Sequence, residues 1–186
     1  PFHFVPKNPV IEVTEGGSKT VDDSVLKLVD DDSPPERLWY EVNTRPNNGI
    51  LAFKADHQRP IKTFTQKDVD GGNIIFTQTG PPIPSFIELN ITDGKFPRQT
   101  VTVAVSVVSL TLEMIKNDTI YIPQASTSVY ITQEQLDSKT NGDRSKILYT
   151  ITRPPLHGRI YVRSYPVTTF TQLDLEKLHE VMYVQQ

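Results

Sequence analysis

Two stretches of the chain repeat one sequence pattern in the same order. Residues 42–51 (VNTRPNNGIL) match residues 151–160 (ITRPPLHGRI) at an offset of 109, and residues 63–68 (TFTQKD) match residues 169–174 (TFTQLD) at an offset of 106. Two blocks with nearly the same spacing indicate tandem copies of one module. An offset of this size allows each copy a hydrophobic core of its own, unlike a solenoid repeat.

The two copies are of unequal length. The sequence predicts a nearly complete domain over residues 1–110 and a second domain over residues 111–186. Residues 181–184 of the second copy correspond to residues 74–77 of the first, so the last two strands of that copy are not among these residues. We expect its sheets to be open at an edge, completed by following residues or by a neighbouring chain.

The composition excludes several classes of function. A net charge of −3 gives no electrostatic reason to bind nucleic acid. No run of about 18 apolar residues is present to cross a membrane. The absence of cysteine removes disulfides, thiolate nucleophiles and cysteine-based zinc sites. Pro1 is not a natural start, so we expect the chain to be part of a longer protein.

Short segments of alternating apolar and polar residues predict β-strands. The clearest alternations cover residues 10–14, 87–91 and 101–107, while residues 38–42 are rich in aromatic and branched side chains. Fifteen prolines disfavour long helices. The fold class that follows is all-β, with tandem β-sandwich domains of the immunoglobulin-like kind.

Local signals also predict a hairpin and two short helices. Residues 38–42 and 50–53 flank a proline-rich turn and resemble a β-hairpin, in which Gly49 supplies a positive φ angle. One-turn helices are expected at residues 65–69 and 132–136, where a threonine precedes polar residues and an apolar anchor.

Several blocks together resemble the chondroitin sulfate proteoglycan (CSPG) repeat. They include Glu15-Gly16, the acidic stretch of residues 28–35, the Pro46-x-x-Gly49 turn, residues 64–68, and residues 87–94 (IELNITDG). The repeat is found in the Fras/Frem extracellular matrix proteins and in the related NG2-type transmembrane proteoglycan. The acidic stretch followed by Ser-Pro-Pro-Glu is more similar to the Fras/Frem proteins.

The resemblance implies a cadherin-like β-sandwich, repeated many times in a large extracellular protein. The expected function is a non-catalytic structural and adhesion module that spaces and presents surfaces in cell–matrix adhesion and basement-membrane assembly. Its partners would be matrix or cell-surface proteins and neighbouring repeats of the same chain. The alternatives are a ligand-binding, receptor-like module of a transmembrane proteoglycan, for which Leu136-Asp137-Ser138 is a candidate integrin-type sequence, and a calcium-rigidified adhesion repeat.

Calcium is the one cofactor that the sequence suggests. Glu15, Asp30, Asp31 and Asp32 could supply several of the oxygen ligands, about six to eight, that Ca²⁺ takes. A solvated loop, in which Asp caps turns and proline stops strand extension, explains the same residues without a metal. In the second copy the acidic motif is reduced to Asn141-Gly142-Asp143, so the role of these carboxylates does not extend to it.

Two asparagines lie in N-glycosylation sequons. Asn90 (NIT) falls on the strand face opposite Ile87, Leu89 and Ile91, and Asn117 (NDT) lies between the two copies. In a secreted protein we expect both to carry a glycan.

No group of residues resembles a catalytic site. The four histidines lie near no nucleophile elbow, and no phosphate-binding glycine loop or H-E-x-x-H motif is present. Trp39 falls on the same strand face as Glu41, and we expect it to pack against the proline-rich loop that follows, with a role as a partner anchor as the alternative.

Overall fold

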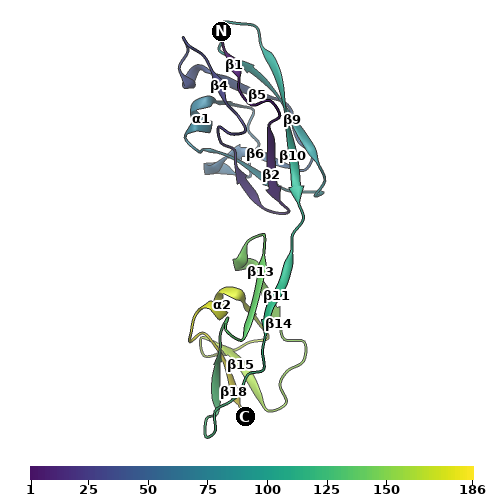
Figure 1. Ribbon diagram of the computed structural model, residues 1–186, viewed down its shortest axis with the longest axis vertical. Helices are drawn as coiled ribbons and strands as arrows, with labels where there is room; N and C mark the ends of the chain where they lie inside the picture. The colour runs from purple at the N-terminus through teal and green to yellow at the C-terminus, as the bar shows by residue number, and fades with distance from the viewer. The chain divides into compact units, whose positions relative to one another are not determined.

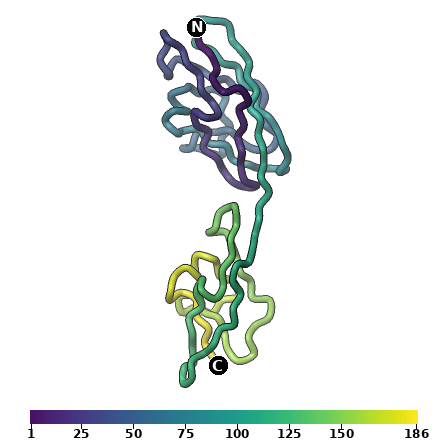
Figure 2. Tube along the Cα trace, viewed as in Figure 1, coloured from purple at the N-terminus to yellow at the C-terminus, as the bar shows by residue number.

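The chain folds into two compact units. The computed structural model describes residues 1–186, and its contacts divide them into Pro1–Ser109 and Leu110–Gln186 (Figure 1). The trace passes from the first unit to the second once, directly after the long strand that ends the first (Figure 2). None of the helices is long and apolar enough to cross a membrane. The all-β class is confirmed.

Unit 1 consists of a five-stranded sheet (order β2-β10-β9-β5-β7), a three-stranded sheet (β3-β8-β6) and the short pair β1-β4. The one α-helix, α1 (Gln66–Asp70), follows β7, and short 3-10 helices cover Pro35–Arg37 and Lys54–Asp56. The strands are β1 (His3–Phe4), β2 (Val10–Thr14), β3 (Ser18–Thr20), β4 (Leu28–Val29), β5 (Trp39–Thr44), β6 (Gly49–Phe53), β7 (Thr63–Thr65), β8 (Ile74–Gln78), β9 (Ser85–Thr92) and β10 (Gln99–Val108).

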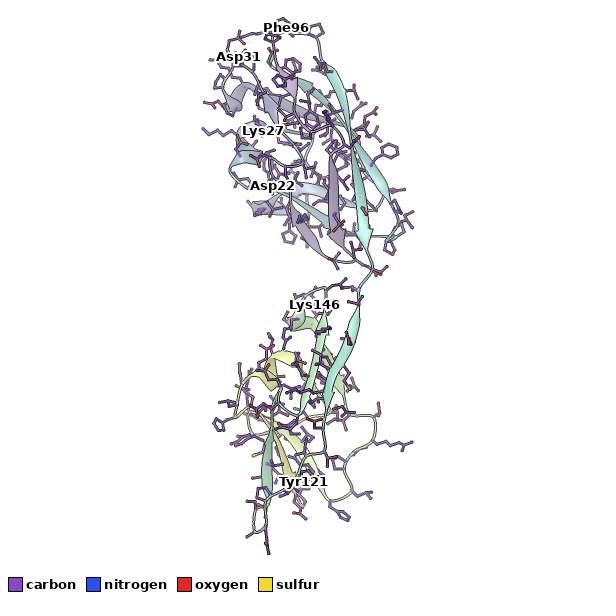
Figure 3. The ribbon with its side chains drawn as sticks, viewed as in Figure 1. Asp22, Lys27, Asp31, Phe96, Tyr121 and Lys146 are labelled. Carbon is purple, nitrogen blue, oxygen red and sulfur yellow. The ribbon has the colours of Figure 1, made fainter.

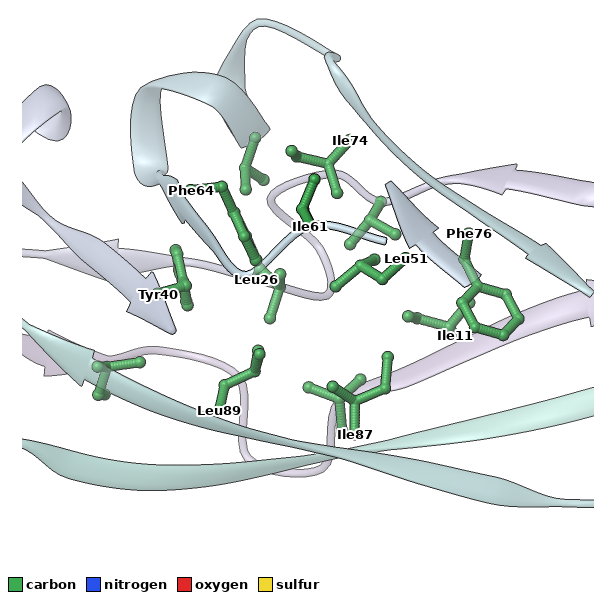
Figure 4. Close-up of a cluster of buried hydrophobic side chains, with 14 of the residues drawn as sticks. Ile11, Leu26, Tyr40, Leu51, Ile61, Phe64, Ile74, Phe76, Ile87 and Leu89 are labelled. Atoms are coloured by element: carbon green, nitrogen blue, oxygen red, sulfur yellow. The ribbon is translucent and has the colours of Figure 1, made fainter. Parts of the chain in front are cut away.

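The core of unit 1 forms from the inward side chains of the predicted strands. In β2, Ile11 and Val13 are buried while Val10 and Glu12 are exposed, and β9 and β10 alternate in the same way. Figure 4 shows side chains from several elements meeting in one cluster, with Tyr40 and Phe64 on one side of it. The period-2 patterns therefore identified the inward face of these strands correctly.

The hairpin predicted around residues 45–48 is wrong. β5 and β6 belong to different sheets, so the turn between them carries the chain across the sandwich. Gly49 does not have a positive φ; instead, a Cβ atom there would overlap the Phe76 ring and the carbonyl oxygen of Thr77. Glycine is required because β6 and β8 approach each other closely at this point.

Unit 2 repeats part of this architecture. Its sheets have the orders β12-β18-β15-β16, β11-β13 and β14-β17, and its helix α2 (Gln172–Glu176) follows β17 as α1 follows β7. The strands are β11 (Leu112–Asn117), β12 (Ser128–Ile131), β13 (Leu136–Thr140), β14 (Leu148–Thr150), β15 (Gly158–Val162), β16 (Tyr165–Pro166), β17 (Thr169–Thr171) and β18 (Val181–Gln185).

In unit 2, the segment that corresponds to β2 is irregular. In unit 1 the only partner of β2 is β10, which pairs with it in parallel. The equivalent residues 119–123 form no strand, although the turn after them is kept: Ala125 has a φ angle of 66°, like 70° at Gly16. A strand without a partner leaves its backbone groups unpaired, so this segment stays irregular.

One of the two predicted helices is wrong. The helix over residues 65–69 is confirmed as α1, but residues 132–135 form a turn that leads directly into β13. In that turn Gln135 accepts hydrogen bonds at Oε1 from the backbone N–H and the hydroxyl of Thr132, both at 3.0 Å. The Thr132 hydroxyl also accepts from the backbone N–H of Glu134 at 3.2 Å, so the threonine cap is present, but strand pairing of Leu136 with Asn117 stops the helix.

Candidate functional site

A buried glutamine binds a tyrosine in unit 1, and the residues around it form a cluster. The Tyr40 hydroxyl donates to Gln66 Oε1 at 2.5 Å, and the backbone N–H of Leu28 donates to the same oxygen at 2.8 Å. The Tyr40 ring stacks on Phe64 with a centroid distance of 4.9 Å. Because every polar group here is paired, the buried amide does not pay the free-energy cost of lost hydration.

Unit 2 contains the same cluster. The Tyr149 hydroxyl donates to Gln172 Oε1 at 2.6 Å, the backbone N–H of Ser138 donates to that oxygen at 3.1 Å, and the Tyr149 ring stacks on Phe170 at 5.4 Å. We call these two sets the tyrosine–glutamine clusters. They explain why the Tyr and Phe-Thr-Gln positions recur in both copies.

A capping box fixes each glutamine in place. Thr65 caps α1 by accepting from the backbone N–H of Asp68, while the Asp68 carboxylate accepts from the backbone N–H of Thr65. Thr171 and Asp174 make the reciprocal pair at α2. Since the glutamine is the first residue of each helix, the box sets the direction in which its side chain enters the core.

A paired carboxylate holds the other end of each glutamine amide. Gln66 Nε2 donates to Asp70 Oδ1 and Gln172 Nε2 donates to Asp137 Oδ1, both at 2.8 Å. Lys27 lies 3.5 Å from Asp70, and Arg144 lies 3.3 Å from Asp137. The Asp137 carboxylate of the candidate integrin-type sequence Leu136-Asp137-Ser138 is thus already bonded to other side chains of unit 2.

The calcium candidates do not lie together. The backbone N–H of Glu15 donates to the carbonyl oxygen of Val108, at the end of β10. Asp32 lies at the opposite end, where the Lys95 ammonium is 3.4 Å from its carboxylate. The intervening strand of ten residues spans about 30 Å. Glu15 therefore cannot share an ion with Asp30, Asp31 and Asp32.

The three aspartates that remain lie in one loop, near the Phe96 turn (Figure 3). The Asp30 side chain is fully covered and lies 3.5 Å from the amino group of Pro1. Burial acts to raise the pKa of Asp30, but the nearby Ser33 hydroxyl, Asp32 and the amino-terminal charge outweigh it and lower the pKa to about 2. Asp31 and Asp32 are exposed, and the chain has no group of three or more acidic or histidine side chains able to hold a metal ion. Glu15, Asp30, Asp31 and Asp32 therefore do not come together as one calcium site.

The two sequons lie on strands. Asn117 is exposed at the end of β11, opposite Leu136 of β13. Asn90 lies on β9 with its side chain on the outer face, where its Oδ1 accepts from the Thr100 hydroxyl at 3.0 Å. Both positions accommodate a glycan without entering a core.

Trp39 does not pack against the proline-rich loop. It lies on the outer face of the five-stranded sheet, 44% exposed, while its neighbours Leu38 and Tyr40 are buried. Its cross-strand partners are Thr65 of β7 and Thr92 of β9. The alternation of residues 38–42 identified the outward face, but the contact expected there is not formed.

The family model for cadherin-like domains matches residues 4–107 and 113–186 of the chain. The chain belongs to the cadherin-like family. The two matched ranges follow the two compact units, and each cadherin-like unit carries one tyrosine–glutamine cluster.

The cadherin-like chain is similar to proteoglycan and matrix proteins. It is 31% identical to chondroitin sulfate proteoglycan 4 of Mus musculus, over 90% of the chain and 7% of that protein. It is 25% identical to FRAS1-related extracellular matrix protein 1 of Homo sapiens (92% and 8%), and 26% identical to extracellular matrix protein 3 of Lytechinus variegatus (91% and 6%). The family expected from the motifs is confirmed, although the identity is higher to the proteoglycan than to the Fras-related protein. The chain spans less than a tenth of the length of these relatives.

The histidines and the tyrosines with shifted pKa values lie in different surroundings. All four histidines are exposed, and His179 makes an edge-to-face contact with the Tyr130 ring at 4.8 Å. The two tyrosines with raised pKa values, Tyr40 and Tyr149, belong to the tyrosine–glutamine clusters, and burial is the main cause of the shift in each. The shifted pKa values of these two tyrosines therefore reflect a structural role.

Proposed function

We propose that this chain is a non-catalytic structural and adhesion module of a larger extracellular matrix or cell-surface protein. The observation that carries the proposal is what the two units have in common: a buried phenylalanine and glutamine, and a tyrosine, buried in unit 1 and half-buried in unit 2, that stacks on the phenylalanine and donates to the glutamine. The exposed residues differ between the copies. Repetition of a scaffold with variable surfaces is suited to spacing and presenting binding surfaces.

The relatives support an extracellular setting. Their names describe a proteoglycan and proteins of the extracellular matrix, and the chain is extracellular like them. Its partners are then matrix or cell-surface proteins and the neighbouring repeats of its own chain. The net charge of −3 supports neither nucleic acid nor an anionic membrane surface as a partner.

A receptor-like module that binds one ligand through one loop is the main alternative. Its clearest sequence candidate, Leu136-Asp137-Ser138, is poorly suited to this role. Ser138 is buried, and the Asp137 carboxylate already accepts from Gln172 and pairs with Arg144. A partner would have to break this pairing to reach the carboxylate.

Cell attachment to immobilised chain 1–186 distinguishes the two functions. Alanine variants would be made one loop at a time, at residues 45–48, 57–60, 80–83, 94–97 and 153–156, with each variant checked for an unchanged melting temperature. For an adhesion module whose surface acts as a whole, each variant keeps at least about half of the wild-type attachment, because rim contacts contribute little individually. Loss of attachment in one folded loop variant alone would assign the chain to the receptor-like class. No attachment of any cell type above a coated, unrelated β-sandwich would overturn the proposal.

A further inference from the structure

The outer face of the five-stranded sheet in unit 1 carries a small hollow beside Trp39. The hollow has a volume of about 200 Å³ and is lined by Trp39, Tyr40, Glu41, Thr63, Asn90, Thr92 and Arg98. Sites for drug-sized ligands begin at about 300 Å³. The hollow beside Trp39 is therefore suited to a single ring.

Asn90 and Thr92, the two residues that define one sequon, both line this hollow. Trp39 lies directly opposite Thr92, and Glu41 lies directly opposite Asn90, so Trp39 and Asn90 are diagonal neighbours on adjacent strands. Side chains in this relation are within reach of an aromatic ring, at about 7–8 Å between backbones. Asn90 Oδ1 accepts from Thr100, while Nδ2, the atom to which a glycan is attached, makes no hydrogen bond.

The chemistry of the lining matches a pyranose ring. The half-exposed indole of Trp39 offers a flat apolar surface to the C–H groups of a sugar. Arg98 and Glu41, whose Nη1 and Oε2 atoms are 2.8 Å apart, offer a donor and an acceptor to the sugar hydroxyls at the rim. The Thr63 hydroxyl adds a group able to donate and accept.

We propose that this hollow binds an N-acetylhexosamine ring stacked on Trp39, and that the ring is the first N-acetylglucosamine of a glycan attached to Asn90. The sugar covers the exposed indole and adjoining sheet surface. This inference goes beyond the adhesion function and does not depend on it. It also implies that partners bind unit 1 on surfaces other than this one.

Trp39 is the only tryptophan of the chain, so its fluorescence reports on this hollow alone. Chain 1–186 would be secreted from animal cells, and glycan occupancy of Asn90 determined by peptide mass. Acrylamide quenching of Trp39 would then be compared in three forms: the intact glycoprotein, the protein trimmed to one sugar per site, and the protein freed of glycan. N90Q gives a protein without a glycan at residue 90 and needs no enzyme treatment. N117Q is the matched control at the other sequon.

The proposal predicts that the intact and one-sugar forms have the same quenching constant, because the first sugar is the one that covers the ring. Removing that sugar, or N90Q, raises the constant about twofold, since the indole regains its exposed half. N117Q leaves it unchanged. An occupied Asn90 whose removal does not change the quenching of Trp39 would overturn the proposal.

A separate arm identifies the source of the sugar. N,N′-diacetylchitobiose is added to folded N90Q, and the quenching constant measured again. Protection of Trp39 in N90Q together with an unoccupied Asn90 in the wild-type protein would show that the ring comes from an external glycan and would overturn its assignment to Asn90. An unoccupied Asn90 with no protection by the disaccharide would overturn the sugar site as well.

Discussion

Tyr40 donates its hydroxyl hydrogen to Gln66 Oε1 at 2.5 Å inside the core of unit 1, and the pair recurs as Tyr149 and Gln172 at 2.6 Å in unit 2. The glutamine oxygen also accepts from a backbone N–H group of a neighbouring strand in each unit. One side chain thus joins the aromatic pair, the short helix and an edge strand. This makes the cluster the most informative place to test the fold.

Removing the tyrosine hydroxyl is expected to destabilise each unit. Tyr40→Phe and Tyr149→Phe keep the ring stacking but leave one acceptor site of a buried amide unfilled, which costs about 1–3 kcal/mol. Tyr121→Phe is the matched control, because Tyr121 is 80% exposed and its loss costs less than about 0.5 kcal/mol. Urea unfolding of the three variants measures the difference. Equal stability of Tyr40→Phe and Tyr121→Phe would show that the hydrogen bond contributes nothing.

The stability of unit 1 should fall in alkaline solution. Burial, and to a smaller degree the Asp70 carboxylate, raises the pKa of Tyr40 well above the 10.0 of an unperturbed tyrosine. The unfolded chain therefore loses this proton at a lower pH than the folded chain. The contribution is complete below about pH 10 and decreases as the pH rises further.

Urea unfolding between pH 8 and 11 checks this prediction. The free energy of unfolding of unit 1 should decrease above about pH 10 in the wild type and less steeply in Tyr40→Phe. Parallel curves for the two proteins would mean that Tyr40 ionises equally well in the folded state, contrary to its burial.

An added methyl group at Gly49 or Gly158 should be strongly destabilising. At Gly49 it meets the Phe76 ring and the Thr77 carbonyl oxygen, and at Gly158 it meets the Tyr183 ring and the Val184 carbonyl oxygen. Gly49→Ala and Gly158→Ala are expected to cost about 1–3 kcal/mol, since overpacking displaces the backbone. In Gly142→Ala, the control, the methyl meets mainly the end of the flexible Leu110 side chain. Thermal unfolding that ranks Gly142→Ala with the other two would contradict this account.

Calcium should not stabilise the chain. Glu15 lies at one end of β10 and Asp32 at the other, and no group of three metal-binding side chains is present. We expect the same melting temperature with 2 mM calcium, on the order of extracellular-site affinities, and with excess chelator. A higher melting temperature in calcium that Asp30→Asn abolishes and Glu15→Gln does not would establish a site in the Asp30–Asp32 loop.

Local sequence patterns predicted the strands and their inward faces, because the alternation of β2, β9 and β10 reflects burial directly. They did not predict that β5 and β6 lie in different sheets, since a turn has the same residues whether it closes a hairpin or crosses a sandwich. They also did not predict that β2 pairs in parallel with β10, because these two strands are distant in sequence.

The candidate sites, like the fold, were predicted only in part from the sequence. The repeat of Phe-Thr-Gln marked a shared element, but a buried glutamine carries no hydrophobic signal, so its bonds to Tyr40 and Tyr149 required the structure. The acidic residues looked like one group because sequence spacing does not show that β10 separates Glu15 from the Asp30–Asp32 loop. The outward position of Asn90 was predicted correctly, and the hollow beside it was not predicted.

Hydrogen exchange of two backbone amides tests the central claim, that the chain holds two copies of one scaffold built on a buried glutamine. The Leu28 N–H is bonded to Gln66 and the Ser138 N–H to Gln172. In Gln66→Met we predict that exchange of the Leu28 amide becomes at least about tenfold faster, equivalent to about 1.4 kcal/mol, while the Ser138 amide is unchanged. Unprotected amides at both positions in the wild type, or equal acceleration of both in the variant, would contradict the account.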